Sequence, residues 1–281
     1  MIIKFLYKLC LPYAKLLISI MEKLVYWPYF NFPFGKTSNA SAKQYLLIWD
    51  KAKEVKYPVI DKIEKDYGFS IDKKWFHNLA LQTQVVIKKS DICYQHGRLL
   101  YTILSHCIKH NPNKNINILE TGTALGFSSL CMAKALNDAG QCGKIITFDV
   151  LPHNIRMFWN CIADEKGPQT RAELLHDYDS LVEKYIIFHQ GDTKIELKKV
   201  NIPRVHFAFL DCSHTYEYVL NEFDSIKDKQ KKGDIIFFDD YTPNLFQGVV
   251  KAVDHICAEF NYLKRVITLN DKRGYVIANK N

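Results

Sequence analysis

Three carboxylates and a histidine follow two short apolar runs in the second half of the chain. Asp211 and His214 come after the run HFAFL, and Asp239 and Asp240 end the run DIIFFDD. If these runs are neighbouring parallel strands, their carboxyl ends meet at one edge of the sheet, where ligands bind. Clustered carboxylates favour a neutralising cation, and oxygen donors suit Mg²⁺ better than zinc. We therefore expect Asp211, Asp239 and Asp240 to hold Mg²⁺, the alternative being that they cap helices.

His214 lies about one helical turn beyond Asp211 in the sequence. A histidine can take a proton near neutral pH, so His214 is a candidate general base. A neighbouring Mg²⁺ would lower the pKa of a substrate hydroxyl and create an alkoxide-like nucleophile. We expect Asp211 and His214 to be catalytic. Two alternatives stay open: His214 contacts only backbone at a helix start, or one of the two residues acts as a base without metal.

A glycine-containing turn follows an earlier apolar run, in the segment INILETGTALGFSSL. Gly122 and Gly126 carry no Cβ, so the backbone can approach a ligand closely. Ser128 supplies a hydroxyl, and the first N–H groups of the following helix favour an anion. By itself the turn is a weak signal, because Ala124 stands where a dinucleotide-binding G-x-G-x-x-G loop has its second glycine.

Two further acidic residues end the next two apolar runs. Asp149 ends the run KIITFDV, and a carboxylate at that strand tip can accept hydrogen bonds from both ribose hydroxyls. The alternative is a solvated loop residue. Asp192 lies in HQGDT, where a Gly-Asp pair is also typical of a turn.

The motif E-x-G-x-x-x-G-F-S at residues 120–128 resembles the first motif of class I S-adenosylmethionine-dependent methyltransferases. This form is found in catechol and caffeoyl-CoA O-methyltransferases and in related sugar O-methyltransferases. The Asp-Asp pair at 239–240 is similar to that of the macrolide-type sugar enzymes. The motif D-x-x-H-T-Y at residues 211–216 resembles bacterial sugar-type methyltransferases. The resemblance spans roughly residues 90–280.

For the methionine half of the cofactor, the resemblance implies roles for four residues of the glycine turn. Glu120 would face the amino end of the methionine. The backbone at Gly122 and Gly126, together with Ser128, would hold its carboxylate.

For the rest of the site, the resemblance implies that Asp149 binds the ribose and that Asp192 lies beside the adenine, unless Asp192 only forms a turn. It also supports Mg²⁺ at Asp211, Asp239 and Asp240, with a histidine nearby as the base.

The elements that must position these residues alternate from residue 115 onward. Short apolar runs alternate with helical stretches, which predicts an α/β fold with a doubly wound, mostly parallel sheet. The expected strands are 115–120, 144–150, 185–190, 205–211, 234–239, 263–269 and 274–278. The last two should form a terminal antiparallel hairpin. The expected helices are 128–139, 171–183, 216–231 and 248–260. This is the seven-stranded, Rossmann-like methyltransferase fold that the resemblance implies.

The first 110 residues read as a separate region of the chain. Residues 1–30 are amphipathic and too interrupted by charges to span a membrane. They are expected either to pack on the protein or a second copy, or to lie on a membrane surface. Residues 31–41 read as a linker, and helices are expected over 41–65, 72–88 and 90–110. We divide the chain into 1–30, a helical cap at 31–110, and a cofactor-binding domain at 111–281.

Composition excludes several other classes of protein. Among 281 residues, 48% are hydrophobic and 24% charged, which is typical of a soluble globular protein and excludes disorder, collagen and a polytopic membrane protein. The net charge is +8, but the lysines are scattered apart from the cluster at 229–232, so we expect no nucleic-acid partner. None of the eight cysteines has the two-residue spacing of zinc or redox motifs, which indicates a reducing compartment.

These observations predict an S-adenosylmethionine-dependent O-methyltransferase. Its acceptor is expected to be a small hydroxylated molecule such as a carbohydrate, with Mg²⁺ assisting. We expect a cytoplasmic homo-oligomer that contacts the inner membrane surface if residues 1–30 bind lipid. One alternative is an NAD(P)-dependent oxidoreductase on the same architecture, which the poor glycine match disfavours. The other is a non-catalytic, membrane-associated binding module.

Overall fold

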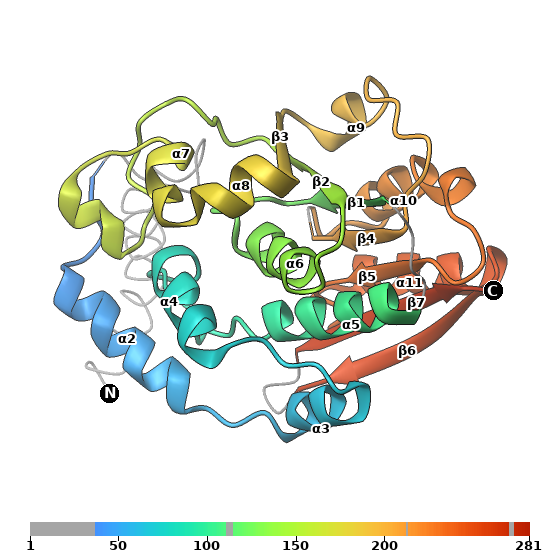
Figure 1. The fold of residues 1–281 in the computed structure, drawn as a ribbon, viewed down its shortest axis with the longest axis horizontal. Coiled ribbons are helices and arrows are strands. Elements are labelled where there is room, and N and C mark those ends of the chain that lie inside the picture. Colours follow the sequence, from blue (N-terminus) through green and yellow to red (C-terminus); the bar gives the residue numbers. More distant parts are fainter. Residues whose placement is uncertain (1–36, 111–114, 212, 270–272) are drawn as a thin grey trace, which may run out of the picture.

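One seven-stranded sheet forms the centre of the molecule. The computed structural model describes residues 37–110, 115–211, 213–269 and 273–281. The strand order is β3-β2-β1-β4-β5-β7-β6 (Figure 1). Strands β1 to β5 run parallel, whereas β7 runs antiparallel to both β5 and β6. The strands are β1 (Ile116–Thr121), β2 (Gly143–Asp149), β3 (Ile186–Gln190), β4 (Phe207–Leu210), β5 (Ile235–Phe238), β6 (Tyr262–Thr268) and β7 (Gly274–Lys280). The predicted parallel sheet and terminal hairpin are confirmed.

The register of the central strands brings their carboxyl ends to one edge. Thr121 at the end of β1 pairs with Leu210 of β4, and Leu210 pairs with Phe238 of β5. The residues that follow these three strands therefore begin at the same level. Because the chain leaves β1 toward β2 on one side and β4 lies on the other, this edge is also the topological switch point where ligands bind.

Helices cover both faces of the sheet, and this explains why β4 and β5 are apolar throughout (Figure 1). One face is covered by α5 (His96–His110), α6 (Phe127–Asp138) and α8 (Asp179–Tyr185), and the other by α9 (Thr193–Glu196), α10 (Tyr216–Asp224) and α11 (Gln247–Glu259). Alternate residues of a strand enter the two cores: Ile118 of β1 faces the first, and Leu119 faces the second.

The N-terminal helices are shorter than the sequence suggested. The predicted helix over 41–65 is wrong, because α2 (Ala42–Glu54) ends before Pro58 and α3 (Pro58–Tyr67) begins there. Proline lacks the N–H that a continuing helix needs, and it disfavours the helical conformation in the residue before it.

The expected helices 72–88 and 90–110 also differ from the structure. Helix α4 (Lys73–Thr83) begins after Asp72, whose Oδ1 accepts a hydrogen bond from the N–H of Trp75 at 2.8 Å. It ends at Thr83, and beyond it Asn160 bonds both backbone groups of Ile87, at 3.0 Å each. The next helix, α5, begins only at His96.

Two predicted helices in the second half are broken into shorter pieces. The stretch 171–183 contains α7 (Arg171–Leu174), the 3₁₀ turn η3 (His176–Tyr178) and α8. The stretch 216–231 contains α10 and the 3₁₀ turn η4 (Lys227–Lys229). The segment after β2 also includes a 3₁₀ turn, η2 (Ile162–Lys166).

The predicted amphipathic segment 1–30 lies outside the described residues, and the division of the chain into three parts stays a prediction. Among the described residues, none of the helices combines the length and apolar character that a bilayer span requires.

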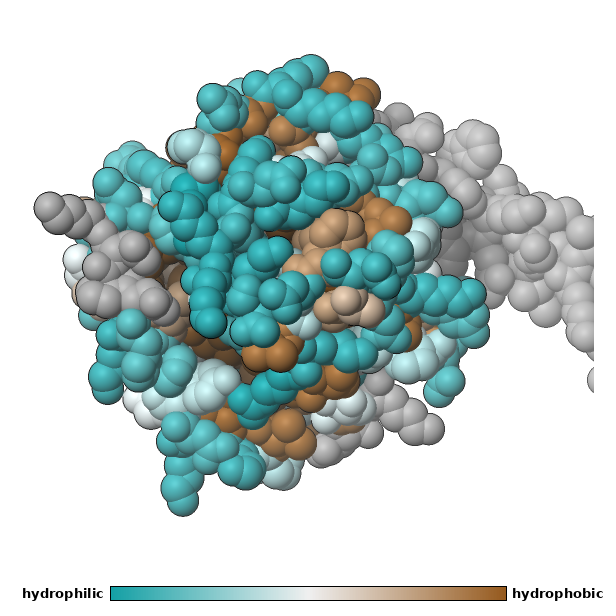
Figure 2. Space-filling model, turned by 90° about the vertical axis from the view of Figure 1, so that its right-hand side faces the viewer, coloured by the Kyte–Doolittle hydropathy of each residue, from teal (hydrophilic) through white to brown (hydrophobic). Residues whose placement is uncertain are grey.

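The face at the right of Figure 1 is mostly hydrophilic, with hydrophobic residues interspersed among the polar ones (Figure 2).

Candidate functional site

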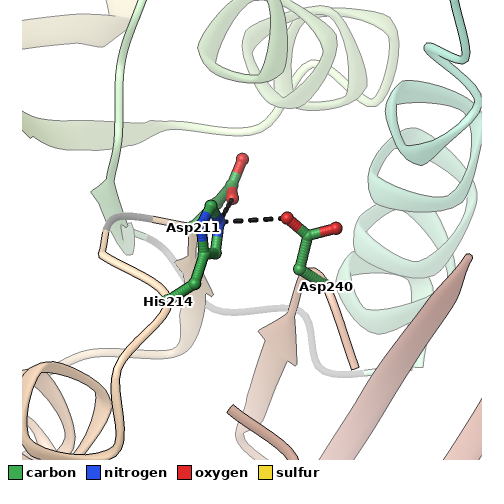
Figure 3. Close-up of side chains that lie close together, drawn as sticks. All are labelled: Asp211, His214 and Asp240. Carbon is green, nitrogen blue, oxygen red and sulfur yellow. Dashed lines mark ion pairs between the residues drawn. The ribbon is translucent and has the colours of Figure 1, made fainter. Parts of the chain in front are cut away.

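Two carboxylates and a histidine meet above the ends of β4 and β5 (Figure 3). Asp211 and His214 follow β4, and Asp240 follows β5. The Nε2 atom of His214 lies 3.0 Å from Oδ2 of Asp240 and 3.6 Å from Oδ1 of Asp211. One ligand atom from each of the three residues lies within 4.8 Å of the others, a spacing that fits one metal ion. The structure thus brings together the predicted Asp211, His214 and Asp240.

Asp239 occupies a deeper position than its neighbour. Its side chain is buried, and Oδ1 accepts a hydrogen bond from the N–H of Asp240 at 2.7 Å. Asp240 itself adopts a left-handed backbone conformation, with φ of 51°. Burial, together with the charges of Asp211 and Asp240, raises the pKa of Asp239 well above its usual range. The role of Asp239 as a metal ligand therefore stays a prediction.

In this acidic cluster (Asp211, His214 and Asp240), the imidazole of His214 pairs with both carboxylates. Hydrogen bonds to Asp211 and Asp240 raise the pKa of His214 to about 10, so the imidazole is protonated at neutral pH in this arrangement. Burial raises the pKa of Asp211, and its hydrogen bond to His214 acts in the opposite direction. His214 can act as a base only when something else engages the two carboxylates.

The glycine turn after β1 lies at the same edge of the sheet. Gly122 and Gly126 have φ angles of 86° and 95°, which favour glycine. Gly126 is also the N-cap of α6 and offers no side chain to the first-turn N–H groups, which leaves that turn open to an anionic ligand. Ala124, at the position where the dinucleotide motif has glycine, also has a positive φ, of 44°.

Glu120 points back into the protein and holds the start of α6. It is fully buried and accepts hydrogen bonds from the hydroxyls of Ser128 and Ser129. Burial raises its pKa to about 7. Because the single hydroxyl proton of Ser128 goes to Glu120 here, Ser128 has no proton left to donate to an anion at the turn, whereas the backbone N–H groups of the turn can still donate. The predicted roles of Glu120 and Ser128 toward methionine stay predictions.

Asp149 and Asp192 both bond backbone N–H groups at the same edge. Asp149 accepts from Ala124 at 2.6 Å and from Leu151 at 2.8 Å, and each of its oxygens keeps acceptor capacity for a hydroxyl. Asp192 caps α9 by accepting from Lys194 at 2.9 Å, so its turn-forming role is confirmed. Its position beside an adenine stays a prediction, as does the binding of ribose by Asp149.

Sequence reasoning missed residues whose role depends on distant contacts. Glu222 of α10 is buried and accepts hydrogen bonds from Thr121 and Thr193, both at 3.0 Å, which ties the end of β1 to α9. Arg171 is also buried, and its Nε donates to the carbonyl of Ala124 in the glycine turn at 3.0 Å. The only sequence signal for either was a polar residue within an expected helix.

Comparisons with known proteins agree with this geometry. A family model described as a methyltransferase domain matches residues 119–241, which include the glycine turn and the acidic cluster. No curated protein matches the chain in sequence.

Solved structures share the fold at low sequence identity. Cofactor-bound Rv0187 from MTB is 14% identical, with a TM-score of 0.53, over 75% of this chain and 92% of that one. The O-methyltransferase TomG from Streptomyces achromogenes, in complex with SAM, is 14% identical, with a TM-score of 0.51, over 75% and 91%. The O-methyltransferase NovP is 16% identical, with a TM-score of 0.51, over 69% and 83%. Residues 119–241 are therefore a methyltransferase domain, on the seven-stranded fold of the class I S-adenosylmethionine-dependent methyltransferases.

Proposed function

We propose that this chain transfers a methyl group from S-adenosylmethionine to a hydroxyl oxygen of a small polyhydroxylated acceptor, with Mg²⁺ assisting. A carbohydrate is the acceptor class that we favour. The observation that carries the proposal is the acidic cluster at the ends of β4 and β5, beside the glycine turn of β1. The names of TomG and NovP support an oxygen acceptor, since both are called O-methyltransferases.

The residues at the sheet edge fit the cofactor in its separate parts. The open first turn of α6 after Gly126 suits the methionine carboxylate, and Asp149 has acceptor capacity for the ribose hydroxyls. Asp192 would border the adenine. Bound S-adenosylmethionine supplies an electrophilic methyl group, and the task of the protein is then mainly to align the acceptor oxygen with it.

The donor set of the acidic cluster fits a hard divalent cation. Asp211 and Asp240 offer carboxylate oxygens, and oxygen donors are those that Mg²⁺ prefers. Bound Mg²⁺ would lower the pKa of an acceptor hydroxyl. With both carboxylates engaged by a cation, the hydrogen bonds that keep His214 protonated would weaken. His214 would then accept the hydroxyl proton as the carbon–oxygen bond forms and the carbon–sulfur bond breaks.

The test is production of S-adenosylhomocysteine in the presence of hydroxylated acceptors. Replacing Asp240 by Asn should lower kcat by at least about 100-fold, as expected for loss of a group that acts in the transition state. Asp254→Asn is the matched control, because Asp254 lies on α11, where it pairs with Lys264. It should leave kcat within about twofold, as expected for a surface ion pair.

Two further measurements separate the parts of this proposal. Chelator should abolish turnover and Mg²⁺ should restore it; full turnover in chelator would remove the metal from the mechanism but leave the methyl transfer. Calorimetric titration should show binding of S-adenosylhomocysteine and not of NAD⁺. Binding of NAD⁺ alone would refute methyl transfer and favour the oxidoreductase alternative.

A further inference from the structure

The short helix α7 packs against the glycine turn that follows β1. Arg171, its first residue, is buried, and its Nε donates to the carbonyl of Ala124 at 3.0 Å. Leu175, directly after α7, is buried as well and lies so close to Gly126 that a Cβ on that glycine would be 2.9 Å from Cδ1 of the leucine. Residues 171–175, which we call the supporting segment, therefore contact the glycine turn at two points.

Ala124 is held at both of its backbone groups. Its N–H donates to Oδ2 of Asp149 at 2.6 Å, and its carbonyl accepts from Arg171. Its φ of 44° lies in the left-handed region, which is unfavourable for a residue with a Cβ unless the surroundings impose it. The two hydrogen bonds supply that constraint, one from the end of β2 and one from the supporting segment.

The hydrogen bond from Arg171 also sets the direction of the next N–H group. The peptide bond between Ala124 and Leu125 is trans, so the N–H of Leu125 points away from the Ala124 carbonyl and hence away from Arg171. This N–H donates to none of the groups that the structure describes. A hydrogen bond at the carbonyl end of a peptide polarises it and strengthens the donor at the other end. The turn thus presents a directed donor at Leu125.

The guanidinium of Arg171 is fixed in one orientation by the residues around it. The ring centroids of Trp159 and Phe188 lie 5.4 and 5.5 Å from its central carbon. Its Nη1 donates to Nδ1 of His153. These contacts come from the segment between β2 and β3 and from β3 itself, so they tie the position of Arg171 to the edge of the sheet.

Stability of the fold alone does not account for an arginine at this place. Burial lowers the pKa of Arg171 to about 10, against the effect of the charges of Asp149 and Glu120, so the side chain is still protonated at neutral pH. Its Nη2 is buried and donates to no acceptor in the described part of the chain. A buried guanidinium with an unused donor is costly to the folded state, which favours a functional reason for its presence.

We propose that Arg171 is a positioning residue for the cofactor: by holding the Ala124–Leu125 peptide, it aims the Leu125 N–H at the carboxylate of S-adenosylmethionine. This inference rests on the proposed function. It assigns to Leu125 a donor role that Ser128 does not fill, because the hydroxyl of Ser128 donates to Glu120. It also makes affinity for the amino-acid end of the cofactor depend on the supporting segment, which lies about 50 residues further along the chain.

The test is calorimetric titration of the full chain with S-adenosylhomocysteine and with 5′-methylthioadenosine. Both probes carry the adenosine group, but only the first carries the carboxylate. Arg171→Gln should weaken binding of S-adenosylhomocysteine by about tenfold or more, and that of 5′-methylthioadenosine by less than about threefold. Arg171→Lys keeps a cation that can donate to the Ala124 carbonyl, so it should recover part of the loss.

Arg156→Gln is the matched control. Arg156 is an exposed arginine of the same inserted segment, and it pairs with Glu173 of α7. Its replacement removes one positive charge without touching the glycine turn, and both affinities should stay within about twofold of the parent. A loss of preference for S-adenosylhomocysteine as large as in Arg171→Gln would indicate a general effect of charge and would overturn the inference.

Two further results would overturn the inference while leaving methyl transfer intact. One is that Arg171→Gln binds both probes as the parent does, or loses affinity for both by the same factor, which would assign Arg171 a structural role only. The other is measured on the parent chain and does not depend on how a variant folds. Saturating S-adenosylhomocysteine should slow hydrogen exchange of the Leu125 amide more than 5′-methylthioadenosine does, and equal rates would contradict the assigned donor. Failure of the parent chain to bind S-adenosylhomocysteine would instead refute the proposed function itself.

Discussion

At the scale of single residues, Glu120 shows how burial changes the chemistry of a carboxyl group. Its folded-state pKa is about 7, against an ordinary value of 4.5. Below pH 4.5 the carboxyl group of Glu120 is protonated in both the folded and the unfolded chain. As pH rises toward 7, the unfolded chain loses the proton while the folded chain retains it, so the free energy of unfolding falls. Above about pH 7 this contribution becomes constant.

We therefore expect Glu120→Gln to flatten the pH dependence of stability between pH 4.5 and 7. The shift corresponds to at most about 3 kcal/mol. Urea unfolding at several pH values measures the free energy, and the variant should lose less stability than the parent as pH rises. Glu217→Gln, at an exposed position on α10, serves as the control and should follow the parent. Parallel curves for Glu120→Gln and the parent would show that Glu120 ionises normally in the folded protein.

Gly126 allows a second test at this scale, because a matched glycine exists at the other end of α6. Gly126 and Gly140 have φ angles of 95° and 60°, so alanine at either position costs about 1 kcal/mol in backbone strain. A Cβ at Gly126 would also lie 2.9 Å from Leu175 Cδ1, whereas Gly140 has open space around it. We expect both variants to lose stability but Gly126→Ala alone to lose affinity for S-adenosylhomocysteine, by about tenfold or more. Equal affinities by calorimetry would mean that the turn does not hold the cofactor.

At the scale of elements, the sequence predicted the strands better than the helices. Apolar runs such as FAFL and IIFF are continuous because helices cover both faces, and that pattern is visible without the fold. Once two apolar runs are taken as neighbouring parallel strands, their carboxyl ends must lie at the same edge of the sheet. The approach of Asp211 to Asp240 was therefore predictable. The burial of Asp239 and its hydrogen bond to the N–H of Asp240 were not, because two adjacent aspartates at a strand end need not point the same way. The backbone of Ile87, just beyond α4, is held by Asn160, which lies 73 residues away in the sequence.

The contact between α5 and α6 depends on a glycine in a helix, which is usually unfavourable. A Cβ at Gly97 would lie 2.6 Å from the ring of Phe127 and 2.8 Å from Sγ of Cys131. We expect Gly97→Ala to lower the free energy of unfolding by about 1–3 kcal/mol, because overpacking outweighs the gain in helix propensity. The double variant Gly97→Ala with Phe127→Leu should recover part of that loss in urea unfolding. Stabilisation by Gly97→Ala would mean that the helices separate at little cost.

At the scale of the whole molecule, the helices before β1 share a core with the sheet. Phe76 of α4 and Tyr94 lie 5.7 and 6.3 Å from Phe127 of α6, measured between ring centroids. His96 lies 5.1 Å from Phe127 and 6.1 Å from Phe209 of β4. The sequence suggested a boundary near residue 110 because the pattern changes there, but pattern alone does not reveal which buried faces meet.

This shared core predicts that residues on both sides of position 110 unfold together. Trp49 of α2 and Trp75 of α4 report on the helical region. A Trp27→Phe, Trp159→Phe background removes the other two tryptophans, of which Trp27 lies outside the described residues and Trp159 is buried beyond residue 110. Thermal unfolding followed by tryptophan fluorescence should coincide with unfolding followed by far-ultraviolet circular dichroism. Phe76→Leu should lower both midpoints equally, because it weakens a contact within one cooperative unit. A fluorescence transition at lower temperature, with most circular dichroism retained, would show instead that the helical region folds as a separate domain.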